Sequence, residues 1–281
     1  MKLRFMQGGG VMGEMMRAHA WADSSLGLAE HWPAQLKTLV ELMLNSPQPM
    51  FAVWGPEQRM FYNDTYMPIL GRHHPGLDRP FLDVWSEIRG DIEPIMARAY
   101  AGEPIYMDDI ELVMHRHGHA EETHFSFFYT PVRGDEGEVA GIFCACAEIT
   151  QEVFAKRERT TELNRLREMF ASSPSCVAVL SGPEHRFELT NPAYLQLIAH
   201  RDVIGLPLRT ALPELQGQGF EALLDRVYRS GEPYTGQAVP VSLVTELGAP
   251  PQERFLNFIY QPMRGGDGRV NGIFVEGVDV T

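Results

Sequence analysis

Several features that would indicate particular classes of protein are scarce in this sequence. Only three cysteines occur in 281 residues, an odd and low number that implies no disulfide framework. No apolar run approaches the roughly 18 residues of a membrane-spanning helix, and the first residues lack the apolar core of a signal peptide, so we expect a cytoplasmic protein. The net charge of −13 argues against nucleic acid or an anionic membrane surface as a partner.

Signatures of catalysis are missing as well. The sequence contains no phosphate-binding loop, no nucleophile–base set and no ATP-binding motif of a kinase. A histidine kinase would need a phosphoacceptor helix and an ATP domain, and no residues remain for them after Thr281. We therefore expect that the chain is not itself an enzyme, and that it is the sensory part of a larger protein or a stand-alone regulator.

What the sequence does contain is a long internal repeat. Residues 256–281 repeat residues 125–150 without a gap, and 11 of the 26 aligned pairs are identical. A repeat this long, seen only twice, indicates a duplicated domain rather than a solenoid. Each copy has about 105–110 residues, a common size for one domain. The predicted organisation is a helical extension, a first module, a linker helix and a second module, at residues 1–45, 46–150, 151–170 and 171–281.

The most regular part of each copy is a predicted β-hairpin. In the first copy Phe125, Phe127 and Tyr129 share one face of a strand, because successive side chains alternate. A glycine-rich turn follows, and the next strand places Cys144 and Cys146 on the inward face. Together with the preceding segments, each copy reads as two strands, a helical segment and three strands. This predicts an α+β fold in which each module is a five-stranded antiparallel sheet with helices on one face.

Several short motifs make the chain resemble the PAS domain family. They are the turn Gly55-Pro56-Glu57, the pair Asn63 and Tyr66, the helix stop Gly102-Glu103-Pro104, the strand Tyr129-x-Pro131-x-Arg133, and the closing Glu148-Ile149-Thr150 and Asp279-Val280-Thr281. The resemblance covers nearly the whole chain from about residue 46. The leader, with Ala20-Trp21 and Trp32-Pro33, resembles that of the sensor domains of bacterial cytoplasmic histidine kinases.

This resemblance implies a sensory function. A tandem-PAS region would form a homodimer and relay a small-molecule or partner signal, through changes in PAS packing, to a histidine kinase or another output domain of a two-component phosphorelay. Two alternatives from other classes stay open. The chain could be a gas or redox sensor that carries haem, a metal or a redox cofactor, or a purely structural dimerisation module.

The resemblance also permits two tests for cofactors. Flavin photoreceptors of this family need a cysteine just ahead of the long helix, and Phe81 and Leu208 stand at that place. Haem-binding members typically use a histidine on the long helix, and residues 91–101 and 219–230 contain none. We therefore predict no cofactor, with the identity of any small-molecule ligand left open.

Four histidines, His115, His117, His119 and His124, lie within ten residues. Imidazole is a common ligand of zinc and neighbouring metals. The cluster, however, surrounds a predicted turn, where polar side chains are expected, and has no cysteines at zinc spacing. We predict no metal site, and the sequence leaves open whether this cluster binds a metal.

If a small molecule binds, we expect it between the long helix and the inner face of the sheet. Such pockets are mostly apolar with few polar groups, and the same residues could equally form filled core. The candidate ligand-binding residues are Tyr66, Trp85, Ile95, Phe127, Tyr129, Cys144 and Cys146 in the first copy, and Tyr194, Phe258, Tyr260 and Val275 in the second.

The segment between the modules, residues 151–170, contains no Gly or Pro and is rich in Glu, Arg and Leu. It reads as one helix of about 30 Å. Leu163, Leu166 and Phe170 have coiled-coil spacing, whereas earlier positions are charged, so the apolar seam is short. A solvated linker helix and a dimeric signalling helix are both consistent with this pattern.

Overall fold

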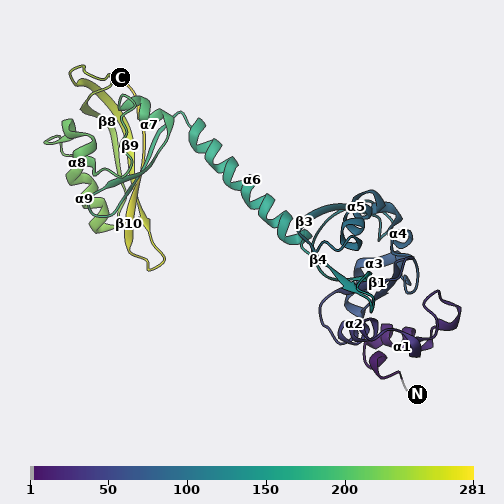
Figure 1. Cartoon of the computed structure of the whole chain (residues 1–281). Coiled ribbons are helices and arrows are strands. Elements are labelled where there is room, and N and C mark those ends of the chain that lie inside the picture. Colours follow the sequence, from purple (N-terminus) through teal and green to yellow (C-terminus); the bar gives the residue numbers. More distant parts are fainter. Residues whose placement is uncertain (1–2) are drawn as a thin grey trace. The chain divides into compact units, whose positions relative to one another are not determined.

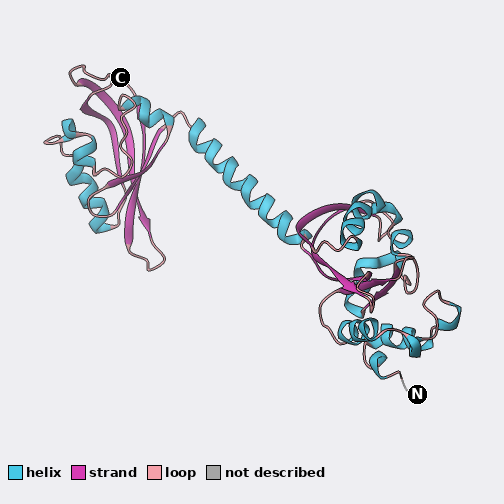
Figure 2. Ribbon diagram, viewed as in Figure 1, coloured by secondary structure: helices cyan, strands magenta, loops and turns pink. Residues whose placement is uncertain are grey.

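The computed structural model describes residues 3–281. The chain divides into two compact units, Met1–Arg157 (unit 1) and Glu158–Thr281 (unit 2). Each unit contains one five-stranded antiparallel sheet accompanied by helices (Figures 1 and 2). The predicted α+β fold of two such modules is therefore confirmed.

In unit 1 the strand order is β2-β1-β5-β4-β3, so the sequence-adjacent strands β4 and β5 pair in the middle and β3 forms an edge. The strands are β1 (Met50–Trp54), β2 (Arg59–Tyr62), β3 (Ile105–Met114), β4 (Glu121–Arg133) and β5 (Val139–Glu148). The α-helices are α1 (Gly10–Ala18), α2 (Ala34–Leu44), α3 (Met67–Leu70), α4 (Phe81–Val84) and α5 (Arg89–Tyr100). Short 3-10 turns are η1 (Arg4–Met6), η2 (Trp21–Asp23), η3 (Ala29–His31), η4 (Asp64–Tyr66), η5 (Gly71–His73) and η6 (Ser86–Ile88).

Unit 2 repeats this topology with the strand order β7-β6-β10-β9-β8. Its strands are β6 (Cys176–Ser181), β7 (Arg186–Thr190), β8 (Tyr234–Leu243), β9 (Gln252–Arg264) and β10 (Val270–Asp279). Its helices are α7 (Pro192–Leu197), α8 (Leu208–Ala211), η7 (Pro213–Leu215) and α9 (Phe220–Ser230). In Figure 1, α8 and α9 lie on one face of this sheet.

Helix α6 (Thr150–Ser172) follows β5 and precedes β6 in the sequence. Along residues 150–172 no side chain is buried. Leu163, Leu166 and Met169 are exposed apolar residues, which a solvated linker helix and a pairing helix would both show. Within residues 3–281, no helix is both long and apolar enough to cross a membrane.

The hairpin register explains the two faces of the sheet in unit 1. Phe127 pairs with Cys146, and Tyr129 pairs with Cys144, so these side chains point to the same face. Helix α5 packs against β3, β4 and β5 and covers this inner face. The inward positions predicted from the alternating pattern therefore face the covering helix.

A buried asparagine fixes the chain around the first strand. The side-chain oxygen of Asn63 accepts hydrogen bonds from the backbone N–H groups of Met50 and Tyr66. Its amide nitrogen donates to the carbonyls of Met43 (3.1 Å) and Gln48 (2.7 Å). Asn63 thus links the end of α2 to β1 and to η4. It stands directly before η4, where an Asn side chain can cap the following turn.

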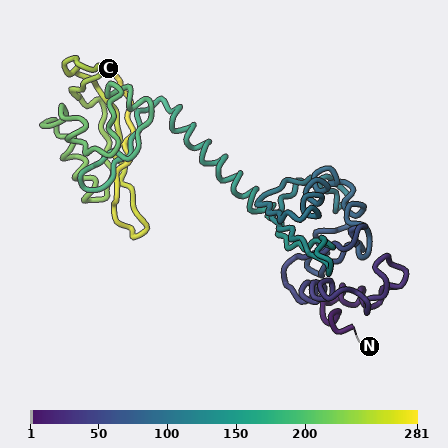
Figure 3. Tube along the Cα trace, in the orientation of Figure 1, coloured from purple at the N-terminus to yellow at the C-terminus, as the bar shows by residue number. Residues whose placement is uncertain are grey.

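The N-terminal residues cover the opposite, outer face beside β1 and β2. Phe61 points to this face, because it pairs with Ala52 while Phe51 pairs with Tyr62 on the other side. Trp21 stacks on the Phe61 ring at 5.6 Å between centroids, and α2 packs against β1 and β2. Figure 3 lets the reader follow this segment from the purple end of the trace.

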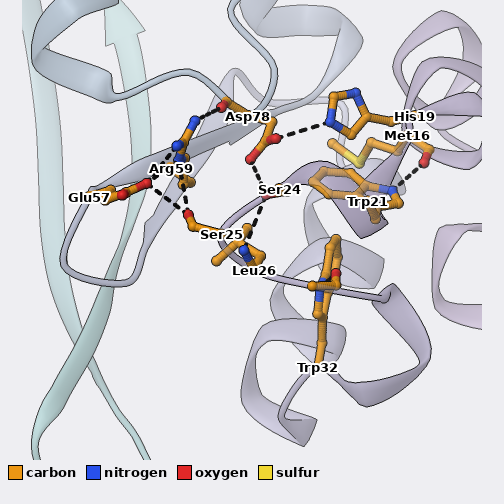
Figure 4. Close-up of polar contacts among 11 residues, drawn as sticks. Met16, His19, Trp21, Ser24, Ser25, Leu26, Trp32, Glu57, Arg59 and Asp78 are labelled. Carbon is orange, nitrogen blue, oxygen red and sulfur yellow. Dashed lines mark hydrogen bonds and ion pairs between the residues drawn. The ribbon is translucent and has the colours of Figure 1, made fainter.

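Two carboxylates hold the N-terminal segment in place. Asp64 accepts hydrogen bonds from the backbone N–H groups of Val11 (2.9 Å) and Met12 (2.7 Å) at the start of α1. Asp78 accepts one from the Ser24 hydroxyl (2.7 Å), and its other oxygen lies 3.0 Å from His19 Nε2 (Figure 4). Residues 1–45 were predicted only as a helical extension, and the structure places residues 3–45 of this segment on unit 1.

Candidate functional site

Unit 1 contains a small cavity between the inner face of its sheet and the helices that cover it. The cavity measures about 40 Å³, whereas one water needs roughly 10–15 Å³ on this scale. It therefore has room for a few waters or for a ligand of only a few heavy atoms. Its walls are Phe51, Tyr66, Ile69, Phe81, Trp85, Ile88, Ile92, Leu112, Met114, Phe125, Phe127, Tyr129, Cys144 and Cys146.

Aromatic rings pack closely around this cavity. Phe51 on β1 stacks on Phe81 of α4, with 4.9 Å between centroids. Tyr129 meets the Phe51 ring edge-on at 5.9 Å and lies 4.5 Å from Phe127 on the same strand. Aromatic pairs at these separations add roughly 0.5–1.5 kcal/mol each beyond simple burial. These ring contacts therefore stabilise the wall of the cavity.

The polar groups on this wall are hydroxyls, thiols and the indole N–H of Trp85, and none of the lining residues is Asp, Glu, Lys, Arg or His. Burial, together with the neighbouring thiols, raises the pKa of the Tyr129 hydroxyl well above its ordinary value. Burial likewise raises the pKa of Tyr66 and of the Cys144 thiol. These three groups are neutral at pH 7. A cavity of this kind favours neutral ligands, because a charge placed in it would lose its hydration without gaining a partner.

Unit 2 has an equivalent cavity of about 60 Å³. It lies against β9 and β10 and is lined by Tyr194, Phe258, Tyr260 and Val275, among others. Burial raises the pKa of the Tyr260 hydroxyl above its ordinary range, so this site also presents neutral hydroxyls.

The greater volume in unit 2 follows from smaller residues at matched positions. Leu212 stands where unit 1 has Trp85, and Gly277 stands where it has Cys146. Each replacement removes atoms from the wall. The two sites thus differ in size and share a pair of tyrosines.

Of the eleven residues predicted to form a ligand site, all but Ile95 line one of these two cavities. Ile95 is half-buried and packs at the margin of the core. The buried positions of α5 are Ile92, Met96 and Ala99, which follow the spacing of one helix face. Ile95 lies beside that face. Ile92, rather than Ile95, is the residue of α5 that lines the cavity.

Several residues of the cavity wall were not predicted, although the alternating strand pattern that turns them inward is present in the sequence. Leu112 and Met114 alternate along β3 and therefore point inward together. Phe51 on β1 also points inward and lines the cavity. Pattern alone marks such residues as core, and only the packed fold shows that a space remains between them.

The histidine cluster is not assembled as a unit. His117 Nδ1 lies 2.7 Å from Glu121, whereas His115 lies near Glu87 and His124 contacts other carboxylates. His119 is exposed in the turn. The four imidazoles therefore do not converge on one point.

A polar junction joins the sheet of unit 1 to α6. Arg116 donates two hydrogen bonds of 2.6 Å to the Glu148 carboxylate at the end of β5. These bonds hold the pKa of Glu148 below its ordinary value. Thr150, the first residue of α6, accepts a hydrogen bond from the His124 N–H (2.9 Å). The last residues of β5 and the first residue of α6 are thus fixed to unit 1.

A protein-family model described as the PAS fold matches the chain twice, over residues 44–153 and 170–281. The two matches cover most of the sequence, and they coincide with the two sheets. The chain belongs to the PAS fold family, and its predicted character as a tandem PAS region is confirmed.

Solved structures of PAS proteins resemble the chain at low identity. An RNA-binding light-oxygen-voltage receptor is 12% identical with a TM-score of 0.34, over 83% of this chain and 95% of that one. A PAS domain from Colwellia psychrerythraea is 14% identical with a TM-score of 0.34, over 42% and 97%. A sensory box histidine kinase from Vibrio cholerae is 12% identical with a TM-score of 0.30, over 45% and 95%.

Proposed function

We propose that the chain is the sensory and dimerisation region of a bacterial signal-transduction protein that acts in the cytoplasm. A histidine kinase is the proposed output domain of the parent protein. The observation that carries this proposal is the charge-free cavity of unit 1, which lies next to the strand that leads into α6. Cys144 and Cys146 line the cavity on β5, and β5 ends at Glu148, two residues before α6 begins.

The proposed signal is a small neutral molecule. The cavity of about 40 Å³ suits a ligand of few atoms that fills apolar space and meets the hydroxyls of Tyr66 and Tyr129. Such a ligand can bias the output only if it binds two arrangements of the protein with different affinities. We propose that the arrangements differ at the end of β5, because Cys146 touches the ligand space and Glu148 holds the junction.

Exposed apolar surfaces support the homodimer. Tyr106 and Phe128 stack at 4.6 Å on the outer face of the unit 1 sheet, where both are more than half exposed. Leu163, Leu166 and Met169 are exposed along α6. Burying either surface against a second copy would be favourable, at roughly 25 cal/mol per Å² of apolar area.

Native mass spectrometry of the gently purified chain tests both parts of the proposal. We expect dimers, and we expect a small mass retained by at least one unit. Cys146→Phe would fill the first cavity, and Gly277→Val, as the matched change, would fill the second. Loss of the retained mass in one variant identifies the sensing unit. A strictly monomeric chain, or a retained mass that survives in both folded variants, would refute the proposal.

A redox or gas sensor is the second candidate, favoured by the two cysteines on the cavity wall. Thiolates bind iron in haem and iron–sulfur proteins, so this candidate requires that the Cys144 thiol lose its proton and that the cavity open beyond its volume of about 40 Å³. An absorption spectrum of the purified chain distinguishes the candidates, because a bound haem, flavin or iron–sulfur cluster absorbs visible light and a small neutral ligand does not. A coloured chain would replace the first proposal by the second.

A further inference from the structure

A group of acidic side chains surrounds one buried histidine on the outer face of β3 and β4, on the side of the sheet opposite the cavity of unit 1. His124 is only 2% exposed. Its Nδ1 lies 2.7 Å from Asp109 Oδ1, and its Nε2 lies 3.0 Å from Glu122 Oε1. Glu111 is the residue directly opposite His124 in the pairing of the two strands. Three carboxylates are therefore gathered around one imidazole.

We propose that Glu111, Glu122 and His124 bind a divalent transition-metal ion such as zinc. One ligand atom from each lies within 4.8 Å of the others. Zinc binds His nitrogen and carboxylate oxygen at about 2.0–2.2 Å, so the ligand atoms must approach to about 3–3.5 Å. Glu111 and Glu122 are exposed, and rotation of their side chains closes this difference.

The second nitrogen of His124 supports the assignment. A histidine that binds a metal almost always donates its other ring N–H to a carboxylate or carbonyl, which fixes the tautomer and the ring orientation. Asp109 occupies this position at 2.7 Å from Nδ1. It leaves Nε2 directed toward Glu122 and available as a ligand. Asp109 is therefore proposed as a positioning residue.

A cationic side chain already sits on this cluster. Arg157, in the second turn of α6, donates a hydrogen bond to Glu122 and lies 3.7 Å from Glu111. The ring of Phe154, one turn earlier, meets His124 edge-on at 6.1 Å. A metal ion would replace the guanidinium on these two carboxylates. Binding of the ion would consequently loosen the contact between the start of α6 and the sheet of unit 1.

The second module provides an internal comparison. Phe255 stands at the position of His124, and it pairs with Pro240 as His124 pairs with Glu111. Ala238 stands at the position of Asp109. Unit 2 keeps the strands and a carboxylate, Glu253, at the position of Glu122, but it lacks counterparts of His124, Asp109 and Glu111. The proposed site therefore belongs to unit 1, and His124→Phe is a substitution that this fold accommodates.

Titration of the full chain with Co²⁺, followed by its visible ligand-field absorption and by calorimetry, tests the proposal. We expect one ion per chain. His124→Phe and Glu122→Gln should each weaken binding by at least about tenfold, and Asp109→Asn by about 10–100-fold. Arg157→Met should tighten binding, by at least about threefold, because the competing cation is gone. His119→Phe, in the neighbouring turn, is the matched control and should change nothing.

The urea midpoint of each variant verifies that unit 1 remains folded. Binding that survives in folded His124→Phe and disappears in His119→Phe would assign the ion to the turn and overturn the site. Unchanged affinity in Arg157→Met would refute the replacement of the guanidinium. An absence of one-to-one Co²⁺ binding in the unaltered chain would refute the proposal as a whole.

Discussion

Asn191 in unit 2 makes the hydrogen bonds that Asn63 makes in unit 1. Its side-chain oxygen accepts from the N–H groups of Val177 and Tyr194, as that of Asn63 accepts from Met50 and Tyr66. Its amide nitrogen donates to the Ser175 carbonyl at 2.8 Å. Both asparagines are at most 2% exposed. The same side chain thus ties the incoming chain, the first strand and the following turn in both modules.

Replacing either asparagine should therefore destabilise its own module. Asn63→Ala and Asn191→Ala each leave several buried backbone groups without a partner, and each such group costs about 1–3 kcal/mol. We expect the free energy of unfolding to fall by at least about 3 kcal/mol in each case, as measured by urea denaturation. Asn45→Ala, at an exposed position, is the control and should change it by less than about 0.5 kcal/mol. A loss below 1 kcal/mol in both variants would contradict this role.

The N-terminal segment that covers the outer face of the unit 1 sheet leads to a second prediction. Phe61 is fully buried under Trp21, whereas Leu189, at the matched position of unit 2, is 47% exposed. Trp21→Ala should cost about 3–5 kcal/mol in the free energy of unfolding, as for other large core truncations. Leu189→Ala should cost less than about 1 kcal/mol. Equal losses from the two substitutions in urea denaturation would show that residues 3–44 contribute little to unit 1.

An ion pair in unit 2 predicts a dependence of stability on pH. Arg201 donates two hydrogen bonds to Glu214 (3.0 and 2.5 Å), and the Glu214 side chain is only 8% exposed. Burial alone would raise the pKa of Glu214, but the hydrogen bonds from Arg201 and backbone N–H groups lower it below the ordinary value. The pair stabilises unit 2 above the unfolded pKa of about 4.3, and this contribution is lost as the pH falls through the lower folded pKa.

Glu214→Gln should accordingly lose about 1–3 kcal/mol of stability at pH 7, and the difference from the unaltered chain should shrink toward pH 3. Urea midpoints measured from pH 7 to pH 3 provide the comparison. Glu221→Gln, an exposed carboxylate on α9, serves as the control. A difference that stays constant or grows as the pH falls would show that the Glu214 carboxylate does not act through its charge.

Much of the fold could be predicted from the sequence, because the repeat and the strand alternation are local signals. The alternation of Phe125, Phe127 and Tyr129 was sufficient to identify the inner face. Ile95 does not line the cavity. Helical spacing gives a periodicity without its phase, and the phase depends on which residues meet the sheet. Which face of α5 points inward is determined by the packing of this helix against β4 and β5.

The cluster around His124 could not be predicted for a different reason. Asp109, Glu111 and Glu122 come from two strands, and the register between those strands shifts between Met107 and Ile110. Which carboxylates meet His124 depends on this irregularity. The sequence therefore showed four neighbouring histidines, whereas the structure groups one of them with acidic residues from elsewhere.

The final prediction concerns the thiols of the first cavity. Cys144 is completely buried, and burial raises the pKa of its thiol well above the ordinary value. Because the thiolate is the reacting species, alkylation of native Cys144 by iodoacetamide at pH 8 should be at least about tenfold slower than in urea. Peptide mass spectrometry measures each cysteine separately, and the half-buried Cys176 provides the comparison within the same sample. Equal rates for native and unfolded Cys144 would mean that the reagent reaches this thiol freely in the folded chain, and the burial of Cys144 would then not protect it.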